Sequence, residues 1–316
     1  MKTPVVYVAL QQFCEADAAP RQRLLEAGFE VRQNTLGRRL RREEVPTFLA
    51  QADAVIAGVE PYDAEVLAAL SKLRCISRCG VGTDSIDVDA AQRRGIAVYT
   101  TPDEVTEPVA QLTVAMILAL ARNFPQHLAA SRAGRWEKRT GVLLSEWTVG
   151  LIGFGRIGRA VARDLSPFGP RLLVTDPALS SGEAPDGVQR VELAALLAQA
   201  DVVSLHASRP PHAGALLGRH ELASMKPGSY LVNTARGHLV DDAALVEALQ
   251  SGHLAGAAID VFATEPYTGA LSQMPQVLCT PHVATLTRAS RAAMERRAAA
   301  HVVEWWTQAS CLTPTS

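Results

Sequence analysis

Apolar residues in the first hundred positions follow two alternating periods. Short apolar runs, typical of strands, are separated by longer segments in which apolar residues recur every three or four positions, as in helices. The pattern predicts strands at 5–10, 29–31, 54–57, 74–78 and 96–99, and helices near 17–27, 43–50, 63–70 and 88–94. Strands that alternate with helices in this way predict a parallel, doubly wound sheet.

The same alternation resumes at residue 147. It predicts strands at 149–152, 172–175, 201–205, 230–233, 257–261 and 277–280, and helices at 156–165, 193–200, 241–249 and 288–306. The predicted fold class is therefore α/β, with two doubly wound parallel-sheet domains.

Two segments lie between these halves. Pro108 suits the first turn of a helix, and residues 109–121 are apolar on nearly every face, so we expect a helix buried between the domains or against a second subunit. Residues 124–145 show no comparable pattern and are interpreted as a long basic connection.

A glycine-rich turn follows the strand at 149–152. Gly153, Gly155 and Gly158 form a G-x-G-x-x-G pattern that opens a helix, and the next strand ends at Asp176. Such a turn lets a backbone approach a pyrophosphate at a helix N-terminus, while the acid accepts hydrogen bonds from a ribose. A carboxylate would repel a 2′-phosphate, which favours NAD over NADP. The alternatives are a purely structural glycine turn and a solvated turn aspartate.

Composition narrows the partners. A formal net charge of −1 gives no reason to expect a nucleic acid or an anionic membrane. The five cysteines are odd in number and lack metal-site spacing, so we expect reduced thiols, a cytoplasmic location and no metal. The N-terminal apolar run is too short for a signal peptide, and the run at 109–121 falls short of the roughly 20 residues that a bilayer needs.

Chemically active side chains end four of the later predicted strands, namely His206, Arg236, Glu265 and His282. Ligands of parallel sheets bind beyond these carboxyl ends. Hydride transfer to a 2-oxo acid needs a proton donor near the carbonyl oxygen, for which His282 is suited, with Glu265 to orient its ring. Arg236 can hold the substrate carboxylate bidentately, helped by backbone N–H groups of the loop Gly80-Val81-Gly82. Taken singly, each could be a solvated charge, a turn acid or a loop histidine.

Several longer motifs carry a family resemblance. They are SRCGVGTDSIDVDAA from Ser77, GLIGFGRIG from Gly150, NTARGHLVDDAAL from Asn233, AGAAIDVFATEP from Ala255 and TPHVA from Thr280. With these motifs the chain resembles the D-isomer-specific 2-hydroxyacid dehydrogenases, and among them the phosphoglycerate-dehydrogenase-like members, over nearly its whole length.

The resemblance implies two domains with different roles. A Rossmann NAD-binding domain at 100–287 would be inserted into a flavodoxin-like substrate-binding domain at 1–99 and 288–316, with the active site in a cleft that closes by hinge motion. It implies Arg236, Glu265 and His282 as the catalytic triad, Asp260 beside the nicotinamide, and a homodimer. The expected cofactor site comprises Gly153, Gly155, Arg156, Ile157, Gly158, Asp176, His206, Thr234, Ala235 and Asp260. The expected substrate contacts are Arg78, Cys79, Gly80, Val81, Gly82, Arg236 and His282.

The resemblance also implies a substrate that is a small 2-oxo or 2-hydroxy acid. Arg78 and Lys138 match positions at which the resembled enzymes place cations that meet a substrate phosphate, although Arg78 could equally be a solvated strand-end charge. Alternatives are a glyoxylate or hydroxypyruvate reductase and a phosphonopyruvate reductase. A different class is the related corepressors, which bind NAD without catalysis.

Overall fold

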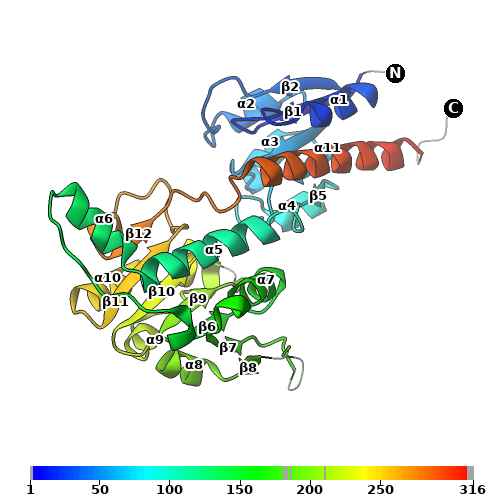
Figure 1. Ribbon diagram of the computed structural model, residues 1–316. Helices are drawn as coiled ribbons and strands as arrows, with labels where there is room; N and C mark the ends of the chain where they lie inside the picture. Colours follow the sequence, from blue (N-terminus) through cyan, green and yellow to red (C-terminus); the bar gives the residue numbers. More distant parts are fainter. Residues whose placement is uncertain (1–2, 181–183, 186, 210, 312–316) are drawn as a thin grey trace. The chain divides into compact units, whose positions relative to one another are not determined.

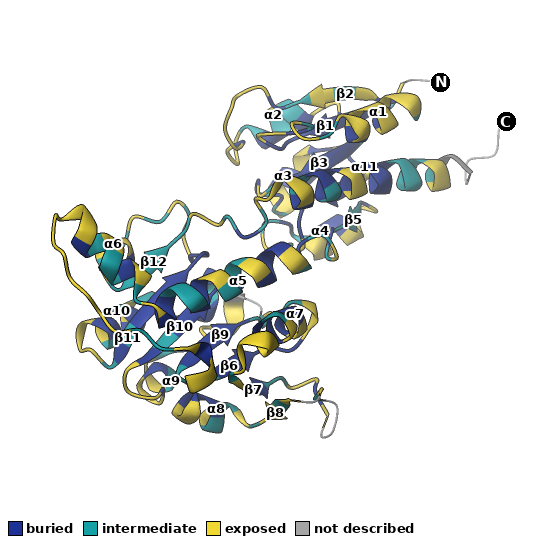
Figure 2. Ribbon diagram, in the orientation of Figure 1, coloured by how far each residue is buried: buried dark blue, intermediate teal, exposed yellow. Residues whose placement is uncertain are grey.

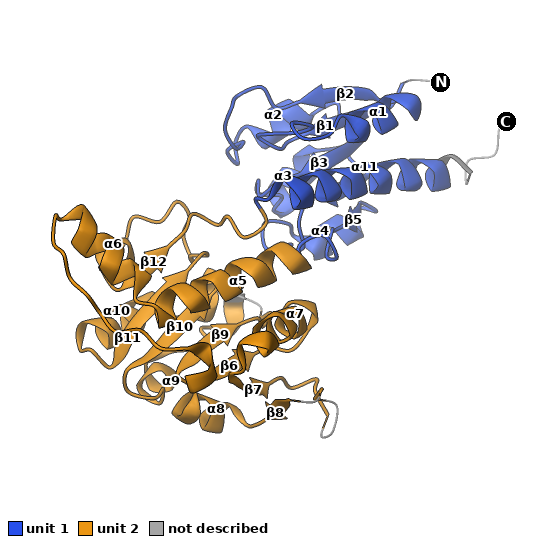
Figure 3. Cartoon of the chain, viewed as in Figure 1, with its two compact units in different colours: residues 1–105, 286–316 blue, residues 106–285 orange. Residues whose placement is uncertain are grey.

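The structure is a computed structural model that describes residues 3–180, 184–185, 187–209 and 211–311. The chain forms two compact units (Figure 3). Unit 1 comprises Met1–Val105 and Leu286–Ser316, and unit 2 comprises Thr106–Thr285, so unit 2 is inserted into unit 1 along the sequence.

Unit 1 is built on a five-stranded parallel sheet with the order β2-β1-β3-β4-β5 (Figure 1). Its strands are β1 (Val5–Val8), β2 (Glu30–Gln33), β3 (Ala54–Ala57), β4 (Cys75–Arg78) and β5 (Ala97–Tyr99). The order of strands reverses between β1 and β3, which makes this the switch point at which doubly wound sheets bind ligands.

Helices cover both faces of the unit 1 sheet. They are α1 (Ala19–Glu26), α2 (Val45–Leu49), α3 (Ala64–Ala69), α4 (Val88–Arg93) and α11 (Arg288–Cys311). The second, third and fourth pack their apolar residues into one core with the sheet. The long α11 packs beside α1 and against β3, β4 and β5. The rings of Phe29 and Trp306 pack edge to face, with their centroids 5.6 Å apart.

Unit 2 contains a seven-stranded parallel sheet with the order β12-β11-β10-β9-β6-β7-β8. Its strands are β6 (Thr148–Ile152), β7 (Arg171–Thr175), β8 (Val188–Arg190), β9 (Val202–Leu205), β10 (Ser229–Asn233), β11 (Leu254–Ile259) and β12 (Val277–Cys279). Here the switch point lies between β6 and β9. Both parallel sheets confirm the predicted fold class.

Two cores enclose the unit 2 sheet, and nearly all residues of its central strands β6, β9 and β10 are buried (Figure 2). Its helices are α5 (Thr106–Ala121), α6 (Phe124–Arg132), α7 (Arg156–Leu165), α8 (Leu193–Gln199), α9 (Arg219–Ala223) and α10 (Asp242–Gln250). One core holds apolar residues of α5 and α7, and the other holds those of α8, α9 and α10. Short 3-10 turns are η1 (Leu144–Glu146), η2 (Ser166–Phe168), η3 (Pro211–Ala213), η4 (Gly237–Leu239) and η5 (Ala270–Gln273).

The interpretation of residues 124–145 as a plain connection was wrong in part. Its first nine residues form α6, with Pro125 in the first turn and Gly134 in the left-handed conformation just past its end. The apolar helix expected at 109–121 exists as α5, but most of its buried side chains pack within unit 2, against α7 and the sheet. Glu107 and Gln111 mark its exposed side.

Within the described part of the chain, no helix combines the length and the apolar character that crossing a membrane requires.

Candidate active site

The glycine turn lies at the switch point of the unit 2 sheet. It follows β6, and a Cβ built on Gly153 would come within 2.6 Å of the backbone of His206, which follows β9. A Cβ on Gly158 would meet the carbonyl oxygen of Gly153 at 2.3 Å, so both positions require glycine. A Cβ on Gly155, by contrast, meets nothing within 4 Å.

This turn fits a dinucleotide. The open space at Gly155 borders the N-terminus of α7, where Arg156 and Ile157 occupy the first turn. Backbone N–H groups in a first helical turn, together with the helix dipole, favour a phosphate group.

Asp176 lies at the end of β7, beside the turn. Its Oδ2 accepts the N–H of Phe154 at 2.6 Å and its Oδ1 accepts the N–H of Ala178 at 2.8 Å. Each carboxylate oxygen has more than one acceptor position, so these bonds fix the side chain and leave acceptor capacity for ribose hydroxyls.

His206 is partly buried on the other side of the switch point. Its Nε2 lies 3.0 Å from the hydroxyl of Ser204, while its Nδ1 is buried without a hydrogen-bond partner among the described residues. Burial lowers the pKa of His206 to about 4, so the ring is neutral at physiological pH. A neutral imidazole beside the turn offers polar contact without adding charge.

Arg236 is presented by the turn that follows β10. The side chain of the buried Asn233 donates to the carbonyl oxygen of Arg236 at 2.9 Å and accepts the N–H of Ala235 at 3.1 Å, which fixes the turn. The Nη1 of Arg236 donates to the carbonyl oxygen of Ala235 at 2.8 Å. Thr234 is buried, and its hydroxyl lies 2.8 Å from that of Thr113 on α5.

Gly237 brings this turn against the segment that follows β11. A Cβ at Gly237 would lie 1.9 Å from the carbonyl carbon of Phe262 and 2.2 Å from the nitrogen of Ala263. Only glycine allows the two backbones to approach so closely. The Arg236 turn is therefore packed directly on the loop that carries Glu265.

Glu265 and His282 form a hydrogen-bonded pair. Glu265 Oε2 lies 3.0 Å from His282 Nδ1, while its Oε1 accepts the N–H of Phe262 at 3.1 Å. The side chain of Glu265 is 33% exposed and that of His282 is 47% exposed, so solvent can reach the hydrogen-bonded pair. His282 itself has a φ of 54°, a backbone conformation uncommon for a residue with a Cβ.

Asp260 anchors the loop that carries His282. It is fully buried, and its Oδ1 accepts the hydroxyl of Thr280 at 2.6 Å and the N–H of Val283 at 2.8 Å, while its Oδ2 accepts the N–H of Ala284 at 3.1 Å. The N–H of His282 also donates to the carbonyl oxygen of Asp260 at 2.9 Å. Both carboxylate oxygens thus bind the backbone just after His282, and Oδ1 also binds the side chain of Thr280 just before it.

The sequence alone does not single out Asn233, Gly237 and Thr280 for these supporting roles. The signal that could have found them is their position, because Asn233 ends β10, Thr280 directly follows β12, and Gly237 directly follows the predicted site residue Arg236.

The Arg78 loop belongs to unit 1. Arg78 donates from Nε to the carbonyl oxygen of Gly82 at 3.2 Å and from Nη1 to that of Cys79. The N–H of Gly80 is bound to the hydroxyl of Thr101 at 2.8 Å. Among the described residues nothing accepts from the N–H groups of Val81 and Gly82, so these two could serve a carboxylate.

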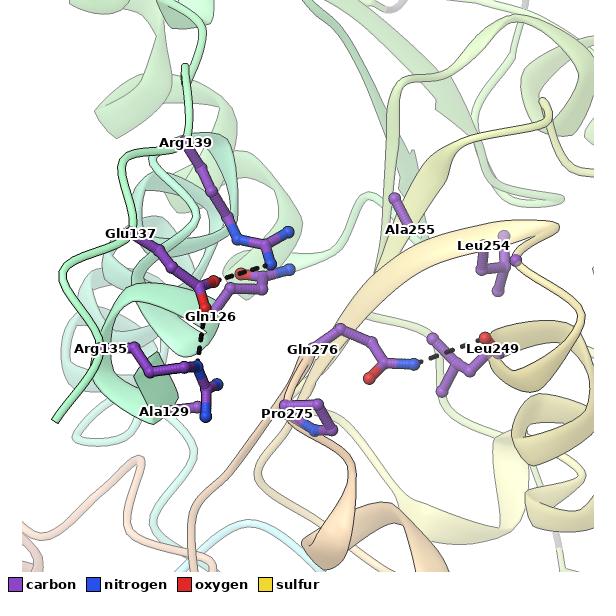
Figure 4. A pocket seen from close by; sticks show the side chains of 11 residues that line it. Gln126, Ala129, Arg135, Glu137, Arg139, Leu249, Leu254, Ala255, Pro275 and Gln276 are labelled. Atoms are coloured by element: carbon purple, nitrogen blue, oxygen red, sulfur yellow. Dashed lines mark hydrogen bonds and ion pairs between the residues drawn. The ribbon is translucent and has the colours of Figure 1, made fainter. Parts of the chain in front are cut away.

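Lys138 lies in an exposed stretch, residues 131–140, well separated along the chain from the triad. Nearby, Glu137 pairs with Arg135 at 2.6 Å and with Arg139 at 3.4 Å beside a cavity of about 320 Å³ (Figure 4). Gln276 reaches the same cavity from the segment before β12. Neither the triad nor the glycine turn lines this cavity, so it is separate from the candidate active site.

Known proteins show the same architecture. Residues 114–284 match the family model described as D-isomer specific 2-hydroxyacid dehydrogenase, NAD binding domain. D-3-phosphoglycerate dehydrogenase of Mycobacterium tuberculosis is 39% identical over 268 residues, which are 83% of this chain and 50% of that protein. The human protein of the same name is 37% identical over 279 residues, 86% of this chain and 51% of its own. The chain thus spans about half the length of these relatives.

Two solved structures are similar over almost their full length. A glyoxylate reductase from Paecilomyes thermophila has a TM-score of 0.85 at 30% identity, with 96% of this chain and 95% of that chain covered. D-lactate dehydrogenase from Aquifex aeolicus, complexed with NAD and lactic acid, has a TM-score of 0.84 at 27% identity, with 96% of each chain covered. The chain belongs to the D-isomer-specific 2-hydroxyacid dehydrogenase family, and unit 2 is where it carries the NAD-binding domain of that family.

Proposed function

We propose that the protein is an NAD-dependent D-2-hydroxyacid dehydrogenase that interconverts a small 2-oxo acid and its 2-hydroxy acid. The observation that supports this most directly is the Glu265–His282 pair, 3.0 Å apart, on a loop packed against the turn that carries Arg236. The three residues follow β11, β12 and β10, which are neighbours in the sheet.

His282 is the proposed acid and base. Because its Nδ1 hydrogen bonds to Glu265, Nε2 is the nitrogen that exchanges a proton with the substrate oxygen. In the reducing direction the imidazolium donates that proton as charge develops on the oxygen, and in the oxidising direction the neutral ring removes it. Glu265 is a positioning residue that holds the ring through this hydrogen bond.

Arg236 is the proposed partner of the substrate carboxylate. A guanidinium can bind a carboxylate through two parallel hydrogen bonds, which fixes the carbonyl for reaction. We propose that the loop Gly80-Val81-Gly82, with Arg78 and Cys79, contributes further substrate contacts, mainly through the N–H groups of Val81 and Gly82.

The cofactor, when bound, supplies or accepts the hydride. Gly153, Gly155 and the first turn of α7 would hold its pyrophosphate, and Asp176 its adenosine ribose. His206, Thr234, Ala235 and Asp260 complete the proposed cofactor site.

Unit 1 is accordingly the proposed substrate-binding domain and unit 2 the NAD-binding domain. We also propose a homodimer in the cytoplasm. The unpaired thiols of Cys14, Cys75, Cys79 and Cys279 support a reducing compartment.

The candidate substrates differ in whether they carry a phosphorus group. The names of the phosphoglycerate dehydrogenase relatives favour a phosphorylated acid, with Arg78 and Lys138 as phosphate contacts. The glyoxylate reductase structure favours a small unphosphorylated acid such as glyoxylate or hydroxypyruvate, and phosphonopyruvate is a further candidate. A corepressor that binds NAD without turnover would have no need of the hydrogen-bonded Glu265–His282 pair.

The test is NADH oxidation with a panel of 2-oxo acids. We expect turnover by the wild type, and a loss of about 10²–10⁴-fold in kcat for His282→Ala with NADH affinity preserved. His220→Ala is the control, because His220 lies on the exposed face of α9. Full activity of the His282 variant contradicts the mechanism, and an inactive wild type that still binds NADH supports the corepressor class.

A further inference from the structure

A buried acid lies at the switch point of the unit 1 sheet. Glu60 follows β3, one of the two strands between which the strand order reverses, and is only 2% exposed. Its Oε2 accepts the N–H of Gly58 at 2.7 Å. A Cβ on Gly58 would lie 2.6 Å from its Oε1, so glycine at position 58 makes room for the carboxylate.

Burial and the groups around Glu60 have opposing effects on its pKa. Burial raises the pKa of Glu60, but the backbone N–H groups of Glu60 and Gly58 and the guanidinium groups of Arg78 and Arg39 oppose this rise. The hydroxyls of Tyr7 and Tyr62 are buried without a partner among the described residues. Burial, with Glu60 nearby, raises the pKa of Tyr7 to about 12, so this hydroxyl stays neutral.

Arg78 is already engaged beside this acid. Its guanidinium binds the carbonyl oxygens of Cys79 and Gly82 and lies over Gly80, where a Cβ would meet Nη1 at 2.9 Å. Glu60 follows the neighbouring strand β3, and its carboxylate partly offsets the positive charge of Arg78. A cation that is balanced in this way attracts a second anion only weakly.

We infer that Glu60 is a specificity-determining residue that selects 2-oxo acids whose side chain carries no second negative charge. The inference rests on the proposed function, because it places the substrate side chain at the carboxyl edge of the unit 1 sheet, beside the loop Gly80-Val81-Gly82. A phosphate there would meet the buried carboxylate of Glu60, whereas a hydroxymethyl group could donate a hydrogen bond toward it.

The experiment compares three probes in NADH oxidation by the full chain. Glyoxylate has no side chain, hydroxypyruvate has a neutral one and phosphohydroxypyruvate has a phosphorylated one. We expect the wild type to prefer hydroxypyruvate over phosphohydroxypyruvate in kcat/KM by about tenfold or more, and Glu60→Gln to narrow this ratio by about tenfold.

Three comparisons separate selectivity from structural damage. Glu60→Gln should leave kcat/KM for glyoxylate within about twofold, because that probe has no side chain to discriminate. Glu60→Asp keeps the charge and should keep the ratio of the wild type. Glu65→Gln removes an equal charge from an exposed acid on α3, and the ratio should not change.

A wild-type preference for phosphohydroxypyruvate overturns the inference, and so does an unchanged or larger ratio in Glu60→Gln. If glyoxylate and hydroxypyruvate are reduced while the ratio does not respond, the selectivity role fails and the proposed function stands. If the wild type reduces none of the probes, both fail.

Discussion

Replacing Gly237 with alanine tests whether the contact between two loops sets the catalytic geometry. The added Cβ would lie 1.9 Å from the carbonyl carbon of Phe262, whereas ordinary van der Waals contact begins at 3.4 Å. The atoms that the added Cβ would meet belong to the backbone of Phe262 and Ala263, so no side-chain rotation can relieve the clash. The Arg236 turn and the Glu265 loop must therefore separate.

The magnitude follows from that separation. The missing distance exceeds 1 Å, and a displacement of about 1 Å in a catalytic group can cost about 10²-fold in rate. Overpacking of this kind costs about 1–3 kcal/mol of stability. For a chain with units of this size, that is a fall in Tm of roughly 2–12 °C.

The assay measures kcat, KM and Tm for Gly237→Ala beside a matched control, Gly218→Ala. A Cβ at Gly218 meets only the carboxylate end of the flexible Glu221 side chain at 3.3 Å, so the control should behave as the wild type. We expect Gly237→Ala to lose about 10²-fold in kcat/KM while its NADH affinity changes little. Wild-type kinetics in a folded Gly237→Ala variant would refute the claim that this contact positions the triad.

Three further variants test other parts of the site. Asp176→Ala should narrow the preference for NAD over NADP by about tenfold, measured as the ratio of the two kcat/KM values; an unchanged ratio would remove Asp176 from the ribose site. Asp260→Asn should lower stability by about 2 kcal/mol and lower kcat more than NADH affinity, because its carboxylate holds the His282 loop; a loss confined to NADH binding would instead place its role at the nicotinamide. His206→Gln should flatten the dependence of unfolding free energy on pH. Burial lowers the pKa of His206 to about 4, so the unfolded chain binds more protons below about pH 6.5, and stability present above that pH is lost as the pH falls toward 4, by up to about 3 kcal/mol. Urea unfolding at pH 7 and pH 5 measures the difference, and identical pH dependence in both proteins would contradict this account.

The pattern of apolar residues predicted the parallel strands well, because buried strands are apolar along their whole length. The strand predicted at 54–57 and the helix predicted at 156–165 match β3 and α7. β8 and α9 escaped prediction because both are short, and β8 is mostly exposed and polar. α6 escaped because few of its residues are buried, Pro125 and Ala130 being the main ones.

The residues at the strand ends could also be predicted from the sequence, because each of them follows the end of an apolar run. The hydrogen bonds and close contacts that each of these residues makes could not be predicted from the sequence. The family resemblance implies Asp260 beside the nicotinamide, and this stays a prediction. That both oxygens of its carboxylate also bind the backbone just after His282 could not be predicted. The sequence does not show that Gly58 and Gly237 have different surroundings. In the structure, a Cβ on Gly58 would meet the side chain of Glu60, whereas a Cβ on Gly237 would meet the backbone of Phe262 and Ala263.

The end of β11 is the common reference for the candidate triad. Asp260, the residue directly after that strand, holds the His282 loop from one side, while Gly237 packs the Arg236 turn against Phe262 and Ala263 from the other. Glu265 lies on the same segment and hydrogen bonds to both Phe262 and His282. Because the Arg236 turn and the His282 loop are both held by this one segment, the end of β11 positions Arg236 and His282 relative to each other.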